Sequence, residues 1–175
     1  MFLKDNKYDR PLNYTWYIGS TCIKRIQVDL GSALSKIPKR LLLFLNISLS
    51  RLSTTTTTIY GFNAWSSQPL GKIHLRCQIG DLKSEVTVYV IDADTSCNVL
   101  LGQPWIHANW IVTSTLHQYF KYMDDKAMVR TVFAETQPFK GVENYFTDSL
   151  LYKESGKTVK KLLSDDINRG SEAGS

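Results

Sequence analysis

The chain has 175 residues, enough for one ordinary domain and too few for two. Apolar residues make up 43% and charged residues 21%, a globular composition that excludes wholesale disorder. The net charge of +5 comes from scattered lysines and arginines, which permits a nucleic-acid partner but does not require one. The longest apolar run, Leu41–Leu45, is far shorter than the roughly 20 residues of a membrane span, and the first residues have no signal-peptide core. We therefore expect a cytoplasmic or nuclear protein that is not secreted and has no membrane partner.

The first part of the chain predicts a hairpin, a short helix and an extended polar segment. β-favouring residues on either side of Gly19-Ser20 predict a β-hairpin over Thr15–Asp29. The segment Pro38–Leu45 begins with a proline, which a first helical turn tolerates, and is predicted to be a short helix. The β-branched run Thr54–Thr58 favours a strand or an extended loop, and Ile59–Gly71 has the composition of a hairpin tip.

The clearest strand pair follows. Polar and apolar residues alternate over Lys72–Ile79 and again from Leu82 to Val90, with Gly80-Asp81 as the turn. Shorter elements are predicted at Asn98–Gly102 (a strand), Pro104–Trp110 (one or two helical turns), and Ile111-Val112 and Leu116–Tyr122 (closing strands). The pattern fades beyond Met123. Short strands separated by glycine turns predict a mainly β domain, either a small barrel or a sandwich.

Cysteines and histidines show no spacing that is typical of a metal site. The cysteines (Cys22, Cys77 and Cys97) include no CxxC pair, and the histidines form no HExxH motif. An odd number of widely spaced cysteines is typical of buried, inert thiols in a reducing compartment. We therefore expect no bound metal.

One segment, Val28–Ala33, carries residue types suited to catalysis. Asp29 ends an apolar strand, Gly31 follows two residues later, and Ser32 comes next. This order places a carboxylate at the edge of a β-core. The glycine beside it has no side chain, so a second chain can approach the backbone closely. Two adjacent carboxylates share one proton, because both cannot ionise, and such a pair can activate a water molecule. The motif alone is weak, and an aspartate in a strand-ending turn is the simpler explanation for it.

Longer stretches on both sides give this motif a context. They are Arg10–Leu12, Tyr17-Ile18, Val28–Leu34, Ile37-Pro38, Ile59–Asn63, Leu70–Ile73, Val90–Asp92, Val99–His107, Ser114–Gln118 and Phe120–Tyr122. In this order and spacing they resemble the retropepsin-like aspartic protease domain of plant LTR retrotransposons of the gypsy class, which is part of a gag-pol polyprotein. The segment after Tyr122 resembles the connector that leads toward reverse transcriptase.

The resemblance implies a fold and a role for particular residues. The fold would be a mainly β, small closed barrel of the acid-protease type with one or two short helices. Asp29 would be the single catalytic aspartate of a half-site, Gly31 and Ser32 would complete its loop, and two chains would form a homodimer. The flap is implied at Gly61–Gly71, including Gly61, Phe62, Asn63 and Trp65, and support of the loop from beneath is implied for Leu100, Leu101 and Gly102.

The implied function is aspartic-type endopeptidase activity on extended, largely apolar sites of the polyprotein. One carboxylate would act as general base on a bound water, and the other, protonated, would polarise the scissile carbonyl. No metal, other cofactor or covalent intermediate is implied. Leu30 departs from the family, whose active members usually carry threonine or serine there, with a hydroxyl that bonds across the dimer. The alternative is a catalytically silent remnant of the same fold that acts as a dimerisation or peptide-binding module.

The resemblance also divides the chain into segments. Residues 1–9 would be an N-terminal extension, 10–122 the protease domain and 123–152 the connector. Residues 153–175, rich in lysine, serine, glycine and acidic residues, are predicted to be a flexible, disordered tail.

Four tryptophans and the positive charge raise a third interpretation, binding of single-stranded nucleic acid. Trp16, Trp105 and Trp110 lie in apolar segments and are predicted to be core residues. Trp65, in the hairpin tip, is equally compatible with capping a substrate cleft and with no role. The sequence contains no zinc knuckle and no basic stripe, which argues against a nucleic-acid partner.

Overall fold

The computed structural model describes residues 10–60 and 66–136. The elements in chain order are β1 (Leu12–Ile18), β2 (Thr21–Val28), β3 (Lys36–Pro38), α1 (Lys39–Phe44), the 3-10 helix η2 (Leu49–Arg51), β4 (Ile59–Tyr60), β5 (Ser66–Ser67), β6 (Gly71–Ile79), β7 (Leu82–Ile91), β8 (Val99–Leu101), α2 (Gln103–Ala108), β9 (Val112–Ser114), β10 (Tyr119–Met123) and β11 (Val129–Phe133). No helix within these two ranges has the length and apolar character needed to cross a membrane.

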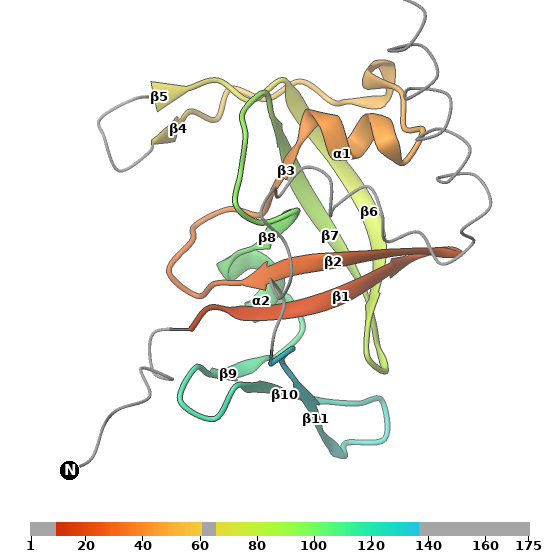
Figure 1. Ribbon diagram of the computed structural model, residues 1–175, viewed down its shortest axis with the longest axis vertical. Helices are drawn as coiled ribbons and strands as arrows, with labels where there is room; N and C mark the ends of the chain where they lie inside the picture. The colour runs from red at the N-terminus through yellow and green to blue at the C-terminus, as the bar shows by residue number, and fades with distance from the viewer. Residues whose placement is uncertain (1–9, 61–65, 137–175) are drawn as a thin grey trace, which may run out of the picture.

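Six of the strands close into a barrel in the order β1-β2-β8-β3-β7-β6 (Figure 1). The pair Tyr17–Gln78 joins β1 to β6 and completes the ring. Strands β2 and β8 run parallel, as do β3 and β7, whereas the hairpins β1/β2 and β6/β7 are antiparallel. Because parallel neighbours need a crossover connection, residues far apart in the sequence meet at the ends of β2, β8 and β3. The predicted mainly β architecture, a closed barrel with two short helices, is confirmed.

Two hairpins, β1/β2 and β6/β7, belong to the barrel wall, and both lie where the sequence predicted strand pairs. The β1/β2 turn contains Gly19 at φ +58°, and the β6/β7 turn contains Gly80 at φ +56°, left-handed conformations that glycine adopts without strain. Along β6 and β7 buried and exposed residues alternate, because successive side chains of a strand point to opposite faces. The inward side chains join the central apolar cluster, among them Ile73, Leu75, Val86, Val88 and Val90.

A smaller sheet, in the order β11-β10-β9, packs against the barrel and lies below it in Figure 1. Its buried residue Phe120 has its ring centroid 4.9 Å from that of Tyr14 and 6.1 Å from that of Trp105. Strands β9 and β10 fall in the region of the predicted closing strands. Strand β11, which no pattern predicted, continues the sheet into the segment 123–152, whose role as a connector stays a prediction. The predicted flexible tail, residues 153–175, lies outside the described residues.

The end of α2 explains an error in the predicted core. Trp110 has φ +52°, and the N–H of Ile111 donates to the carbonyl oxygen of Ile106 at 3.0 Å. In this Schellman-type ending, the left-handed residue turns the chain, so that Ile111 packs back onto the helix and Trp110 points outward. Trp110 is 84% exposed, and its prediction as a core residue is wrong. Trp16 and Trp105 are buried, as predicted.

The segment between α1 and β6 holds a short ribbon. Thr54–Thr58 has no helix or strand, which agrees with the predicted extended loop. It leads into the ribbon β4/β5, which projects from the barrel at the upper left of Figure 1. The pairs Ile59–Ser67 and Tyr60–Ser66 form the base of the predicted hairpin. The predicted flap residues Gly61, Phe62, Asn63 and Trp65 lie outside the described residues.

Candidate active site

Asp29 lies directly after β2, where the ends of β2 and β8 meet the start of β3. Val28 is beside Leu101 in the parallel pair, and the N–H of Asp29 donates to the carbonyl oxygen of Leu101 at 3.0 Å. Leu100 in turn pairs with Lys36, the first residue of β3. The barrel therefore fixes the main chain of Asp29. Its half-buried side chain lies on the opposite face from buried Val28, as strand alternation requires.

The loop after Asp29 is held by short-range hydrogen bonds. The N–H of Gly31 donates to Asp29 Oδ1 at 2.9 Å, and the N–H of Ser32 donates to the Asp29 carbonyl oxygen at 3.2 Å. The hydroxyl of Ser32 donates to the carbonyl oxygen of Leu34 at 2.8 Å. One carboxylate oxygen is thus oriented by the backbone. The motif residues Asp29, Gly31 and Ser32 are brought together as the sequence indicated.

Gly102 lies beneath this loop. Its N–H donates to the buried Ser35 Oγ at 3.0 Å, and the N–H of Gln103 donates to the Ser32 carbonyl oxygen at 2.8 Å. A β-carbon on Gly102 would lie 2.5 Å from the carbonyl oxygen of Leu34 and 2.6 Å from that of Ser32. Only a glycine permits this close approach of β8 to the loop. Leu101 and Gly102 therefore do contact the loop, whereas Ser35, a further contributor, had no sequence signal.

Gly102→Ala is expected to destabilise the fold by about 1–3 kcal/mol, because backbone atoms of the loop must move to admit a methyl group. The exposed neighbour supplies the control, since Gln103→Ala removes only a surface side chain and should change stability by less than about 0.5 kcal/mol. Thermal denaturation followed by circular dichroism measures both variants. Equal melting temperatures would show that the loop does not depend on this contact.

The Asp29 side chain lines an open groove of about 430 Å³. One side consists of Gln27, Leu100 and Lys36, which are neighbours across β2, β8 and β3. The other side is the loop of residues 92–97, which contributes Asp94, Thr95, Ser96 and Cys97. Most of these side chains are polar, so the groove suits an extended polar ligand as well as an apolar one.

Two ion pairs attach the loop 92–97 to α1. Lys39 Nζ lies 3.3 Å from Asp92 Oδ2, and Arg40 Nη1 lies 3.0 Å from Asp94 Oδ1. Arg40 Nη2 also donates to the carbonyl oxygen of Thr95 at 3.4 Å. These contacts attach the loop 92–97, which forms one wall of the groove, to α1, which does not line the groove.

The groove that contains Asp29 is also lined by a thiol, that of Cys97. Burial raises the pKa of the Cys97 thiol to about 11, and the negative charge of Asp29 adds to the increase. The thiol is therefore protonated at neutral pH and is a poor nucleophile. Cys22 and Cys77 are buried, and none of the three cysteines forms a disulfide. The prediction of inert thiols agrees with this arrangement.

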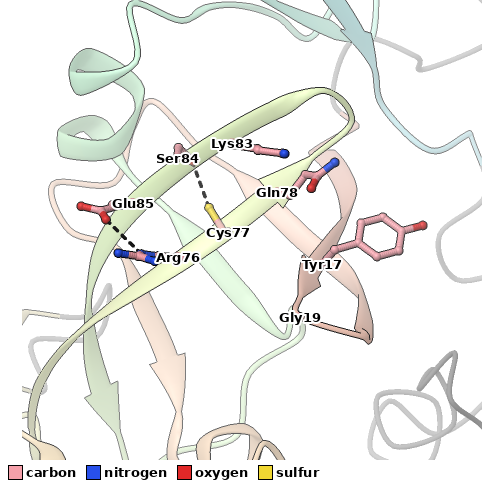
Figure 2. Close-up of a pocket in the computed structure, with 8 residues that line it drawn as sticks. All are labelled: Tyr17, Gly19, Arg76, Cys77, Gln78, Lys83, Ser84 and Glu85. Atoms are coloured by element: carbon pink, nitrogen blue, oxygen red, sulfur yellow. Dashed lines mark hydrogen bonds and ion pairs between the residues drawn. The ribbon is translucent and has the colours of Figure 1, made fainter.

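A second hollow lies at the far end of the β6/β7 hairpin (Figure 2). There Cys77 Sγ and Ser84 Oγ are 3.0 Å apart, and Arg76 Nε lies 3.3 Å from Glu85 Oε1. Lys83 lines this hollow, whereas Ile91, eight residues further along β7, lines the Asp29 groove. The lining residues of the two sites that come closest along β7, Glu85 and Ile91, are six positions apart, which is about 20 Å at about 3.3 Å per residue. The hollow in Figure 2 therefore takes no part in chemistry at Asp29.

The fold matches solved structures of known proteins. It is similar to the retroviral protease-like domain of Ddi1 from Leishmania major, with a TM-score of 0.53 and 16% sequence identity over 72% of this chain and 99% of that chain. The fold is retropepsin-like. This similarity confirms the retropepsin-like barrel that the sequence resemblance implied.

Two further structures show weaker similarity. A retropepsin-like aspartic protease from Rickettsia conorii has a TM-score of 0.46 and 19% identity, covering 71% of this chain and 91% of that chain. The protease of Simian Foamy Virus (mac) has a TM-score of 0.38 and 18% identity, covering 54% of this chain and 91% of that chain. No protein-family model and no curated protein matches the sequence. The similarity to the Leishmania major domain, at 16% sequence identity, shows the fold alone.

Proposed function

We propose that this chain is an aspartic endopeptidase domain that works as a homodimer and hydrolyses peptide bonds. In this proposal it belongs to the gag-pol polyprotein of a plant LTR retrotransposon of the gypsy class, and that polyprotein is its substrate. The retrotransposon origin rests on the sequence stretches between Arg10 and Tyr122. The hydrolytic activity rests on one structural observation, the carboxylate of Asp29 in its groove.

That carboxylate is suited to act on water. Gly31 binds Oδ1 at 2.9 Å, which fixes the plane of the carboxylate, and the side chain lines an open groove that a peptide can enter. The groove has one other carboxylate among the described residues, Asp94, which is paired with Arg40 at 3.0 Å. A pair of aspartates sharing one proton therefore requires a second copy of the chain, related by a two-fold axis.

The two copies of Asp29 would divide the chemistry. The ionised carboxylate takes a proton from a bound water as the water attacks the scissile carbonyl carbon. The protonated carboxylate donates a hydrogen bond to the carbonyl oxygen, where negative charge develops. Proton transfer to the leaving nitrogen then breaks the C–N bond, and the pair returns to sharing one proton.

The proposal is tested by incubating the full chain with a random peptide library at mildly acidic pH, beside Asp29→Ala at the same concentration. We expect cleavage by the wild type alone, with specific activity that rises as the protein concentration increases and dimers form. A protein that stays monomeric at high micromolar concentration would have no such site. Folded wild type and variant with equal cleavage would also contradict the proposal.

A second candidate function, a catalytically silent module that dimerises or binds peptides, is favoured by Leu30. This residue follows Asp29, is 48% exposed and has no hydroxyl with which to bond across a dimer. In this case the groove would bind a peptide without cleaving it. An intact dimer with no Asp29-dependent cleavage supports the silent module.

Leu30→Thr is expected to raise kcat/KM and to tighten the dimer, each by about tenfold, because two symmetry-related hydrogen bonds contribute about 1 kcal/mol each or less. Leu30→Val is the matched control, since valine has the shape of threonine without the hydroxyl. Sedimentation equilibrium and peptide cleavage measure the two effects. Identical behaviour of the threonine and valine variants would show that no hydroxyl bond forms.

A further inference from the structure

The groove beside Asp29 contains an ammonium group, that of Lys36, with no carboxylate partner among the described residues. Lys36, the first residue of β3, lines the groove and is half-buried. Within residues 10–60 and 66–136, no carboxylate oxygen lies within 4.0 Å of its ammonium nitrogen. A partly buried ammonium has lost some of its hydration, so a negatively charged group placed beside it restores favourable interactions.

The other charged side chains that line the groove, among the described residues, are the carboxylates of Asp94 and Asp29. Asp94 is paired with Arg40 at 3.0 Å, and Asp92, in the same loop, is paired with Lys39 at 3.3 Å. Asp29 accepts its hydrogen bond from the N–H of Gly31. The remaining polar lining is uncharged, because Gln27, Thr95 and Ser96 carry amide and hydroxyl groups. Among the described residues that line the groove, Lys36 is therefore the cation to which an incoming carboxylate would respond.

We infer that Lys36 selects peptides with a glutamate or aspartate side chain close to the scissile bond. The inference rests on the proposed function, since it assigns a substrate class to the same groove. A substrate chain that passes Asp29 in extended form projects alternate side chains toward the sheet, where Leu100 of β8 lies between Gln27 of β2 and Lys36 of β3. The largely apolar sites implied by the resemblance do not use this charge.

The selectivity is expected to be moderate. A charge-assisted hydrogen bond in a partly solvated groove is stronger than one between neutral groups, but solvent and salt weaken it. We expect peptides with glutamate to be cleaved with about tenfold higher kcat/KM than matched peptides with glutamine. Peptides with lysine at the same position should be cleaved more slowly than those with glutamine.

The experiment uses peptides that differ at one position only. The starting point is a peptide that the wild type cleaves. In this peptide, each of the four positions on either side of the scissile bond is changed in turn to glutamate, glutamine or lysine. The full-length wild type, Lys36→Met, Lys36→Glu and Lys83→Met are compared. Lys83 is an exposed lysine at the far end of β7, in the hollow of Figure 2, so its replacement changes the net charge without changing the groove.

We expect one position at which the wild type and Lys83→Met prefer glutamate about tenfold over glutamine. The preference should vanish in Lys36→Met and reverse in Lys36→Glu, in favour of lysine. Cleavage without a glutamate preference, or a preference that survives in Lys36→Met, would overturn the inference and leave the proposed function standing.

Absence of any cleavage would contradict the proposed function, and binding then decides the inference. Fluorescence anisotropy with labelled glutamate, glutamine and lysine peptides measures binding to the same four proteins. About tenfold tighter binding of a glutamate peptide, lost in Lys36→Met and kept in Lys83→Met, supports selection by Lys36. Equal binding of the three peptides by the wild type overturns it.

Discussion

Asp29→Asn is expected to lower the rate of peptide cleavage by about a thousandfold or more while leaving the fold intact. The amide cannot take a proton from water, so the general base is lost. It retains an oxygen that can accept the hydrogen bond from the N–H of Gly31, which the carboxylate accepts at 2.9 Å. The rate is measured on a single peptide selected from the library, and thermal denaturation checks that the variant is folded.

A mixing experiment tests whether two chains share the site. If subunits exchange at random, a ninefold excess of Asp29→Asn leaves about one dimer in a hundred as a wild-type homodimer, and the activity of the added wild type falls about tenfold. The same excess of Lys83→Met, a variant that retains Asp29, should not reduce the total cleavage activity. Activity that stays proportional to the wild type added would contradict a site built from two copies of Asp29.

Trp105→Ala is expected to destabilise the protein by about 3–5 kcal/mol, a large part of the stability of a domain of this size. Trp105 is 2% exposed, its Nε1 donates to Ser84 Oγ at 3.0 Å, and its ring meets Phe120 edge-on at 87°. The substitution leaves a cavity between the barrel and the β9–β11 sheet and removes the donor of a partly buried hydrogen bond. Urea denaturation measures the change as a lower midpoint.

Trp110→Ala is the matched control. It removes the same side chain from a residue near the other end of α2, but from a position that is 84% exposed. Because truncation of an exposed side chain leaves no buried cavity, we expect the free energy of unfolding to change by about 0.5 kcal/mol or less. If both variants had the same urea midpoint, the packing of α2 against Phe120 would not contribute as described.

Local patterns predicted those parts of the fold in which one face of an element is buried. The alternation over Lys72–Ile79 and from Leu82 to Val90 determined both strands of β6/β7, since a shift by one residue would expose the apolar face. Trp110 was misplaced because an apolar neighbourhood does not reveal the left-handed turn that ends α2. Strand β11 was missed because four of its five residues are exposed, so its sequence shows no buried face.

The candidate site was predictable only where a motif carried it. The order of Asp29, Gly31 and Ser32 indicated the loop, and the resemblance implied that Gly102 lies beneath it. Lys36 had no such signal, because a lone lysine at the start of a short, proline-containing strand is typical of many surfaces. Its place in the groove follows from the pairing of β3 with β8, a contact between residues 64 positions apart (Lys36 and Leu100) that no local pattern contains.

The two ends of the described chain lie together. The N–H of Glu135 donates to the carbonyl oxygen of Asn13 at 2.8 Å, and Arg10 Nη1 donates to that of Thr136 at 3.4 Å. A unit whose two ends are adjacent tolerates insertion into a surface loop of another protein. It also tolerates circular permutation, in which the ends are joined and new ends are made in a loop, because neither change disrupts its strand pairing. The described unit could therefore be inserted into another protein through its two adjacent ends, which are distinct from the end of β2 where Asp29 lies.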